Sequence, residues 1–189
     1  MFMKRVFLSF IICVLFAGSV FAAISDSDFF GLCEKGSLQQ INDAIKNGAN
    51  VNARDRSSAT TPLLIAARFN PDPSVITALT NAGADVNAQD RLGNTPLIVA
   101  IINNPNPGVI TALVRAGSDI NEKKNMGMTP LMFAALNFNN SEAIITTLLE
   151  LGANPRLRND FGNMAIDMAM ENRKLRNTEA HRILEEASR

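Results

Sequence analysis

Acid–base or nucleophilic catalysis in this chain would depend on His181, because it is the only histidine among the 189 residues. A hydrolytic site pairs a Ser or Cys nucleophile with a His base, and a zinc site needs clustered His and Cys ligands. Cys33 is far from His181 along the chain, and no serine or cysteine shares its place in the repeating pattern described below. A surface position on a terminal helix is the favoured interpretation of His181. No catalytic residue, metal ligand or cofactor site is therefore predicted, and the chain is not expected to be an enzyme.

Acidic residues are the remaining candidates for catalysis, since two carboxylates in one cleft can have shifted pKa values and act as acid and base. In the polar loops of this chain, acids alternate with bases: Arg54, Asp55, Arg56, Asp90, Arg91, Glu122, Lys123, Lys124, Arg156, Arg158 and Asp160. This alternation favours a solvated charged rim over a site for a mildly acidic partner. An enzyme with an atypical acidic site is the least favoured alternative, and no glycine-rich loop has a nucleotide-binding spacing.

Two sequence motifs recur along the chain about every 34 residues. Thr-Pro-Leu occurs at residues 61–63, 95–97 and 129–131, and a phrase similar to Gly-Ala-Asn-Val-Asn begins at Gly48, Gly83, Gly117 and Gly152. A period of this length indicates one supersecondary unit stacked on copies of itself, because a single unit cannot bury its apolar face alone. Function is therefore expected on an extended surface before any pocket.

Each unit is predicted to contain two helices joined by a turn. The threonine of Thr-Pro-Leu suits an N-cap, and the proline suits the first helical position, where no N–H is needed. Apolar residues at helical spacing follow the proline and continue the first helix. The glycine that begins each Gly-Ala-Asn-Val-Asn motif is expected to end the second helix in a left-handed conformation. Cys33 falls where Ala67 and Ala135 stand in later units, so its thiol is predicted to be buried rather than reactive.

The wording of residues 82–88 and 90–97, Ala-Gly-Ala-Asp-Val-Asn-Ala and Asp-Arg-Leu-Gly-Asn-Thr-Pro-Leu, resembles the ankyrin repeat. The resemblance implies an all-α repeat fold, an ankyrin-type solenoid of about five stacked helix–turn–helix units with short β-hairpin-like tips. A single domain is expected over residues 23–189, with units at about 26–49, 50–84, 85–118, 119–153 and 154–189. The charged end of the last unit suits a cap that faces solvent.

Two departures from the family's wording bear on the packing. The turn between paired helices is longer than usual and rich in Asn and Pro, at residues 70–73, 104–107 and 137–140, which resembles a form seen in bacterial ankyrin proteins. Proline there is expected to end the first helix and preset the second. The family's His after Thr-Pro-Leu is replaced by Leu64, Ile98 and Met132, which predicts apolar contact between units in place of a polar link.

The first 22 residues are similar to an export signal. Lys4 and Arg5 precede an apolar run, and Val-Phe-Ala at residues 20–22 forms a small-residue cleavage site. Cleavage is expected after Ala22 or Ala23, which would make the protein periplasmic or secreted; a retained membrane anchor is the alternative. Removal of residues 1–22 leaves 16 basic and 18 acidic residues, with no clustered basic surface for nucleic acid or anionic lipid.

In the family, partners are usually held by the loop tips and the inner faces of the first helices. Carried over to this chain, that role gives an apolar stripe of Leu92, Met126 and Phe161 at successive tips. Contiguous exposed apolar surface usually marks an interaction site, although these side chains would equally well bridge adjacent tips. The full candidate set for partner binding is Leu92, Met126, Phe161, Met128, Ile102, Leu136, Arg68, Phe69, Arg91 and Asn125.

The resemblance implies an exported protein-binding module that acts through its concave tip and inner-helix surface. The partner is another protein, and neither nucleic acid nor, after signal cleavage, a membrane is expected to bind. Within this class, the chain could stabilise an enzyme, neutralise a toxic effector as an immunity protein, or act as an effector on a host protein. A monomer is expected, and a self-associating structural protein is the alternative from another class.

Overall fold

The computed structural model describes residues 24–137 and 141–189 as a row of paired helices. The expected export signal at residues 1–22 and most of the third inter-helix turn lie outside the described residues. In the described part, ten α-helices and one short 3-10 helix form, and no strand does. Their bounds are α1 Asp26–Lys35, α2 Leu38–Lys46, α3 Pro62–Phe69, α4 Pro73–Asn81, α5 Pro96–Asn103, α6 Pro107–Arg115, η1 Asn125–Gly127, α7 Pro130–Leu136, α8 Ser141–Glu150, α9 Ala165–Glu171 and α10 Glu179–Ser188.

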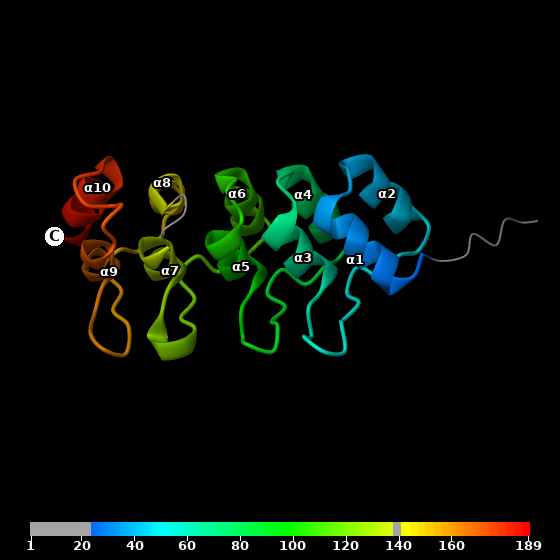
Figure 1. Ribbon diagram of the computed structural model, residues 1–189, viewed down its shortest axis with the longest axis horizontal. Coiled ribbons are helices and arrows are strands. Elements are labelled where there is room, and N and C mark those ends of the chain that lie inside the picture. The colour runs from blue at the N-terminus through cyan, green and yellow to red at the C-terminus, as the bar shows by residue number, and fades with distance from the viewer. Residues whose placement is uncertain (1–23, 138–140) are drawn as a thin grey trace, which may run out of the picture.

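The helices form two layers that run the length of the stack (Figure 1). Each odd-numbered helix from α1 to α9 packs against the next odd-numbered helix, and each even-numbered helix from α2 to α10 packs likewise against the next. We call the odd-numbered helices the inner helices and the even-numbered ones the outer helices. The loops between units project from the inner side of the stack (Figure 1). This arrangement confirms the predicted all-α solenoid of five helix pairs.

The repeated Thr-Pro starts each central inner helix as predicted. The hydroxyl of Thr61 accepts a hydrogen bond from the amide of Leu64 at 3.3 Å, and Thr95 and Thr129 accept from Ile98 and Met132 in the same way. Proline follows at the first helical position of α3, α5 and α7. The glycines expected to end the outer helices have positive φ, from +85° at Gly48 to +105° at Gly117. The local signals in the sequence therefore set both ends of the helix pair.

The inter-helix turns bear out the role expected of proline. α3 ends at Phe69 and α4 begins at Pro73, with the side chain of Asp72 as its N-cap. α5 and α6 repeat this geometry, with Asn106 as the N-cap before Pro107. Each turn therefore ends one helix and caps the next within three residues. Of the third turn, only Asn137 belongs to the described residues.

The core lies between the two layers and is apolar along the whole stack. Alanines at 66, 67, 100, 134 and 135 are fully buried and let neighbouring inner helices approach closely. Leu64, Ile98 and Met132, at the place of the family's histidine, are also buried, so apolar contact replaces a polar link there as predicted. Cys33 is fully buried in the same core, at the position predicted from Ala67 and Ala135.

A polar link between repeats does exist, at a place that the sequence interpretation missed. An asparagine follows each of the inner helices α3, α5, α7 and α9 and donates its side-chain N–H groups to backbone carbonyls of the preceding unit. Asn70, Asn104 and Asn172 are buried, and Asn137 is half-buried. Asn104 Nδ2 reaches the carbonyls of Ala67 and Asn70 at 3.0 and 2.9 Å, and its Oδ1 accepts from the amide of Asn106. Asn70, Asn137 and Asn172 donate to the unit before them in the same manner. We call these four residues the asparagine ladder.

The ladder satisfies the carbonyls that an α-helix leaves without an intrahelical partner at its C-terminus. Each asparagine thus caps the helix end of its neighbour, and the Oδ1 atoms of Asn70, Asn104 and Asn172 also hold the turns that these residues begin. The signal was present in the sequence, because Asn recurs at the start of every predicted turn. By itself this recurrence indicates only a turn, since only the stacked structure brings the preceding unit's carbonyls within reach.

The loops between units are four tips, which we define as residues 54–60, 89–94, 122–128 and 156–163. Each is closed by a backbone hydrogen bond, for example from the amide of Asp90 to the carbonyl of Asn94 at 3.1 Å. The hairpin-like tips expected from the resemblance are therefore turns without strands in the described chain, where one isolated bridge joins Lys124 and Met128.

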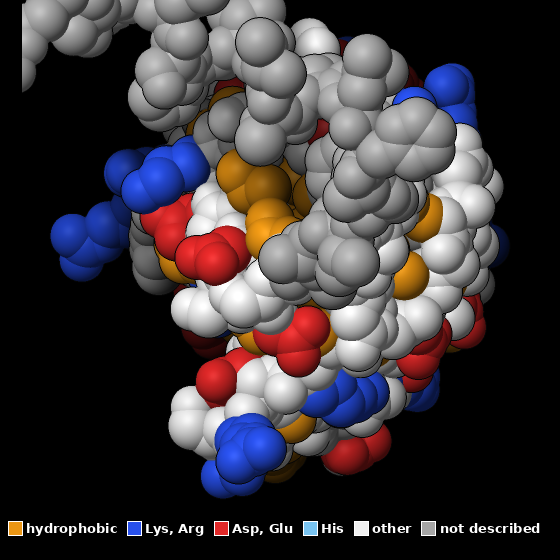
Figure 2. Space-filling view, turned by 90° about the vertical axis from the view of Figure 1, so that its right-hand side faces the viewer, with side chains coloured by type: hydrophobic (Ala, Val, Ile, Leu, Met, Phe, Trp, Pro, Cys, Tyr) orange, Lys and Arg blue, Asp and Glu red, His pale blue; other side chains and the backbone are white. Residues whose placement is uncertain are grey.

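The two ends of the stack differ. α10 covers the C-terminal end, with Arg182 paired to Glu179 and Glu186 and Arg189 paired to Glu185 on its exposed surface. The charged, solvent-facing cap predicted for the last unit is thus present. Figure 2 looks onto the N-terminal end, where hydrophobic side chains lie in the middle and charged ones around them. No helix in the described part of the chain is long and apolar enough to cross a membrane.

Candidate functional site

The four tips are joined to one another by hydrogen bonds from each tip to the one before it. The amide of Arg91 donates to the carbonyl of Ser58 at 3.0 Å, and Asn125 Nδ2 donates to the carbonyl of Leu92 at 3.2 Å. The amide of Asp160 donates to the carbonyl of Met126 at 3.1 Å. These bonds fix the register between tips, so the tips form one continuous edge along the stack, which we call the tip edge.

This register places the three residues of the predicted apolar stripe in consecutive positions. Leu92 provides the carbonyl that holds Asn125, which precedes Met126, and Met126 provides the carbonyl that holds Asp160, which precedes Phe161. Their side chains are 72 %, 60 % and 70 % exposed, respectively. Packing against neighbouring tips would bury them, so the structure shows three solvated apolar side chains in line on the tip edge.

Met126 has a backbone conformation that is unfavourable for its residue type. Its φ is +61°, in the left-handed region, and it precedes Gly127, which also has positive φ. A residue with a Cβ is uncommon in this region, and strained backbone of this kind is concentrated at functional sites. The third tip therefore accepts strain while Met126 stays exposed on the tip edge.

The inner helices add a second row of exposed apolar residues behind the tips. Phe69 and Ile102 are exposed as predicted, while Leu136 is half-buried. Met170 is also exposed and was missed. The inner helices α7 and α9 are one residue shorter than α3 and α5.

The shorter helix shifts the register by one residue in the last two units. Asn137 and Asn172 therefore occupy the asparagine ladder instead of the exposed row, and Asn172 is buried. Measured from the ladder asparagine, Met170 stands where Arg68 and Ile102 stand in earlier units. Equivalent positions on the inner helices are therefore aligned better from the ladder asparagine than from the threonine that begins the helix.

Met128 has to be removed from the candidate set. Its side chain is only 5 % exposed and packs in the core, and its sulfur lies 3.6 Å from Asn159 Nδ2. The residue before Thr129 points inward between two tips, so a partner cannot reach it in this structure. Its place in the sequence resembled a tip position, because tip and core residues are only one residue apart there.

Arg68 lies on inner helix α3 and is half-buried. Its guanidinium carbon is 5.7 Å from the centroid of the Phe69 ring, a cation–π arrangement. Its Nε is buried without a hydrogen-bond partner among the described residues. A small cavity of about 20 Å³ beside it is lined by Thr60, Leu64, Ile65, Asp90 and Val99, so Arg68 and Phe69 form one unit between two repeats.

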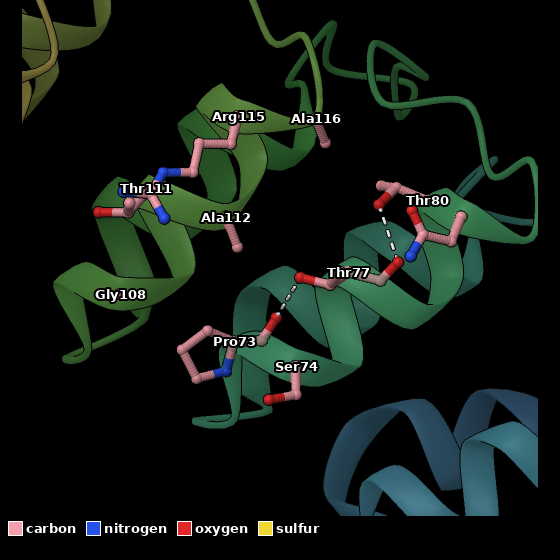
Figure 3. A pocket seen from close by; sticks show the side chains of 10 residues that line it. Pro73, Ser74, Thr77, Thr80, Gly108, Thr111, Ala112, Arg115 and Ala116 are labelled. Carbon is pink, nitrogen blue, oxygen red and sulfur yellow. Dashed lines mark hydrogen bonds between the residues drawn. The ribbon is translucent and has the colours of Figure 1, made fainter.

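A larger groove lies on the opposite side of the stack, between outer helices α4 and α6 (Figure 3). Its volume is about 540 Å³, and its walls carry Thr77, Thr80 and Thr111. All three threonine hydroxyls donate to backbone carbonyls of their own helices. The three threonine donors are therefore satisfied within their own helices.

The structure does not bring Cys33, the possible nucleophile, close to His181, the possible base. Cys33 is on α1 and His181 on α10, at opposite ends of the stack (Figure 1). His181 is half-buried, and its Nδ1 has no hydrogen-bond partner among the described residues. In residues 24–137 and 141–189 no three His, Cys, Asp or Glu side chains cluster as metal ligands would.

Burial raises the pKa of the Cys33 thiol to about 12. Because the thiolate is the reactive form, we expect native Cys33 to react with a thiol reagent at least tenfold more slowly than after unfolding in urea. The free energy of unfolding should fall as pH rises from about 9 towards 12, since the unfolded state loses the proton first. Thiol titration of the full chain with Cys13→Ser checks the first result, and equal rates in native and unfolded protein would contradict it.

The geometry of a repeat solenoid agrees with the comparison to protein families. The family model described as ankyrin repeats (3 copies) matches residues 29–124 and 63–159, which together cover more than half of the chain. No curated protein matches the sequence. The match spans all the tips except the end of the fourth, together with the inner helices α3, α5 and α7; of these, α3 and α5 carry the exposed residues Phe69 and Ile102.

Proposed function

Because this chain belongs to the ankyrin-repeat family, whose repeats serve as protein-interaction modules, we propose that it binds another protein through the tip edge and the inner helices. The observation that carries this proposal is the line of Leu92, Met126 and Phe161, three solvated apolar side chains in hydrogen-bonded register. Exposure of apolar surface to water is unfavourable, and this free energy is regained when a partner covers the surface.

The inner face extends this surface with a second row. Phe69, Ile102 and Met170 are exposed on the inner helices, and the Arg68–Phe69 pair lies among them. Aromatic, methionine and arginine side chains are enriched where protein interfaces form. A partner that contacts both rows would bury a surface spanning several repeats, as solenoid proteins do.

The proposal includes a role without catalysis, in an exported protein that is a monomer by itself. Support for export comes from the charged start, apolar run and small-residue site at residues 1–22. The immunity, effector and stabilising roles are three versions of the same binding activity. They differ in the partner alone, so identification of the partner distinguishes them.

Partner capture tests the proposal. The triple variant Leu92→Ser, Met126→Ser, Phe161→Ser should weaken binding to the captured partner at least tenfold, since each truncation removes an exposed apolar contact. Its stability should stay within about 0.5 kcal/mol of the wild type, because exposed side chains contribute little to folding. Affinity of wild type and variant for the partner captured from the cell-envelope fraction is the measurement.

The control is Leu38→Ser, Leu151→Ser and Val86→Ser, three half-buried apolar residues outside the tip edge. Val86 and Leu151 pack against the core, so this variant should be less stable than the wild type but, while folded, should keep its affinity for the partner. If the folded tip-edge variant binds the partner as tightly as the wild type, the assignment of the surface is wrong. Light scattering tests the monomer: a mass that rises with concentration in the wild type but not in the tip-edge variant would identify self-association instead. The intact mass of protein from the same fraction shows whether residues 1–22 or 1–23 have been removed.

A further inference from the structure

The tip edge carries a surplus of positive charge. Seven basic and four acidic residues lie within the four tips, a net charge of +3, although the whole chain has a net charge of zero. Exposure increases the contrast, because Arg54, Arg56, Arg91, Lys123, Arg156 and Arg158 are all exposed, while Asp160 is the one exposed acid of the tips. The alternation seen in the sequence therefore does not carry over to the surface.

Three of the four tip acids are occupied inside their own tips. Asp55 Oδ1 accepts hydrogen bonds from the amides and hydroxyls of Ser57 and Ser58. Asp90 accepts from the amides of Leu92 and Asn94 and from the side chain of Asn94. Glu122 forms an ion pair with Lys124. Asp55 and Asp90 therefore hold turns, and Glu122 neutralises Lys124. None of the three is paired with Arg56, Arg91 or Lys123.

Most of the tip bases, in contrast, donate to backbone carbonyls. Arg91 Nη2 donates to the carbonyl of Arg56, and Lys123 Nζ to that of Arg158, each across to a neighbouring tip. Among the described residues, no carboxylate lies within ion-pair distance of Arg56, Arg91 or Lys123. A guanidinium has five N–H donors, so a single bond to a carbonyl leaves most of them available to a carboxylate.

We infer that the tip edge binds an extended acidic segment of a protein partner, whose apolar side chains contact Leu92, Met126 and Phe161 and whose carboxylates meet Arg56, Arg91 and Lys123. This inference rests on the proposed function and names the chemistry of the partner. The charge surplus selects an acidic partner, because like charges across an interface are repelled. The single line of tips selects an extended segment, since a chain laid along it meets apolar and basic residues in alternation.

The inference is tested with three fluorescein-labelled synthetic 12-residue peptides and protein purified after expression of the full-length sequence. One peptide alternates Glu with Leu, the second alternates Lys with Leu, and the third alternates Glu with Ser. Fluorescence anisotropy should show the Glu–Leu peptide binding at least tenfold more tightly than either of the others. Its affinity should fall severalfold when salt is raised from about 50 to about 300 mM, because the contacts are solvent-exposed charges.

Charge-neutralised variants assign the contact to the tip edge. Arg56→Gln with Lys123→Gln should weaken binding of the Glu–Leu peptide about fivefold, as removal of two exposed charge contacts does. The matched control is Lys46→Gln with Arg115→Gln, which removes the same charge from exposed positions on the outer helices α2 and α6.

Three results would overturn the inference: no binding of the Glu–Leu peptide at millimolar concentration, binding of the Lys–Leu peptide as tight as that of the Glu–Leu peptide, or equal effects of the two charge variants. The proposed function has a separate test in the captured partner and the triple serine variant. If that partner still requires Leu92, Met126 and Phe161 while the peptides fail, the surface is correct and the acidic chemistry is wrong. If the partner does not require them, the proposed surface itself fails.

Discussion

Replacement of Asn104 by alanine is expected to lower the free energy of unfolding by about 3 kcal/mol. The variant loses two hydrogen bonds to the preceding unit, at the carbonyls of Ala67 and Asn70, and one from the amide of Asn106. Asn104 is 3 % exposed, so water cannot replace these partners without opening the contact between units. Each buried group left without a partner costs about 1–3 kcal/mol. Urea denaturation followed by circular dichroism measures the change.

Asn103→Ala is the matched control, one residue away on α5. Asn103 is exposed, and its side chain donates only to the carbonyl of Val99 in the same helix. Its replacement should change the free energy of unfolding by less than about 0.5 kcal/mol. Similar losses for Asn103→Ala and Asn104→Ala would show that the asparagine ladder does not join the repeats energetically.

The position of Asn104 in the middle of the stack has a further consequence. Stability in a repeat solenoid is approximately the sum of the repeats and of the interfaces between neighbours. Weakening one interface in the centre should broaden the unfolding transition as well as shift it, because the two halves then unfold less cooperatively. A lower denaturant slope for Asn104→Ala than for the wild type would report this effect.

The second large effect is expected at Gly127, where alanine should cost about 3 kcal/mol. Gly127 has a φ of +70°, a conformation that costs an L-residue about 1–2 kcal/mol. A Cβ there would also lie 2.8 Å from the backbone nitrogen of Asp160 and closer still to its side chain. The amide of Asp160 donates a hydrogen bond to the carbonyl of Met126, so relief of this overlap has to separate the third and fourth tips.

Gly152→Ala separates the two contributions. Gly152 has a φ of +95°, but nothing lies within 4 Å of the place where its Cβ would be. Its replacement should therefore cost only the conformational part, about 1–2 kcal/mol. If Gly127→Ala is no more destabilising than Gly152→Ala, Gly127 does not contact Asp160 closely enough to exclude a Cβ.

Gly127→Ala also links stability to the proposed interface. Movement of the third tip from the fourth would change the spacing of Met126 and Phe161, although neither side chain is altered. Partner affinity should then fall by a factor similar to that of a direct replacement of one of them. Unchanged affinity in a destabilised Gly127→Ala protein would indicate that the partner does not contact both tips.

Much of the fold could be predicted from local residue chemistry. Thr61, Thr95 and Thr129 cap helices because a hydroxyl can accept from an amide three residues on, and this requires no distant partner. Turn prolines and left-handed glycines act over similarly short distances. The 34-residue period then predicts stacking, since no single unit can bury its apolar residues alone. The burial of Cys33 followed from the same alignment.

The interactions between repeats could not be predicted in this way. Asn104 reads as a turn residue, and only the stacked neighbour supplies the carbonyls of Ala67 and Asn70 to which it donates. Met128 reads as a tip residue, yet it lies in the core because the chain reverses direction just before it. The register shift that exposes Met170 results from a one-residue difference in helix length, which pattern counting did not detect.

The sequence by itself determined the helix pair, its caps and the number of copies, because these depend on contacts within a few residues and on a fixed period. It also placed Leu92, Met126 and Phe161 at equivalent positions. Only the tertiary structure decided that these side chains are exposed in one line and that, among the described residues, Arg56, Arg91 and Lys123 have no carboxylate within ion-pair distance. Both properties depend on how one tip bonds to the next across about 35 residues of chain, and exposure and charge pairing are set by that contact rather than by residue type.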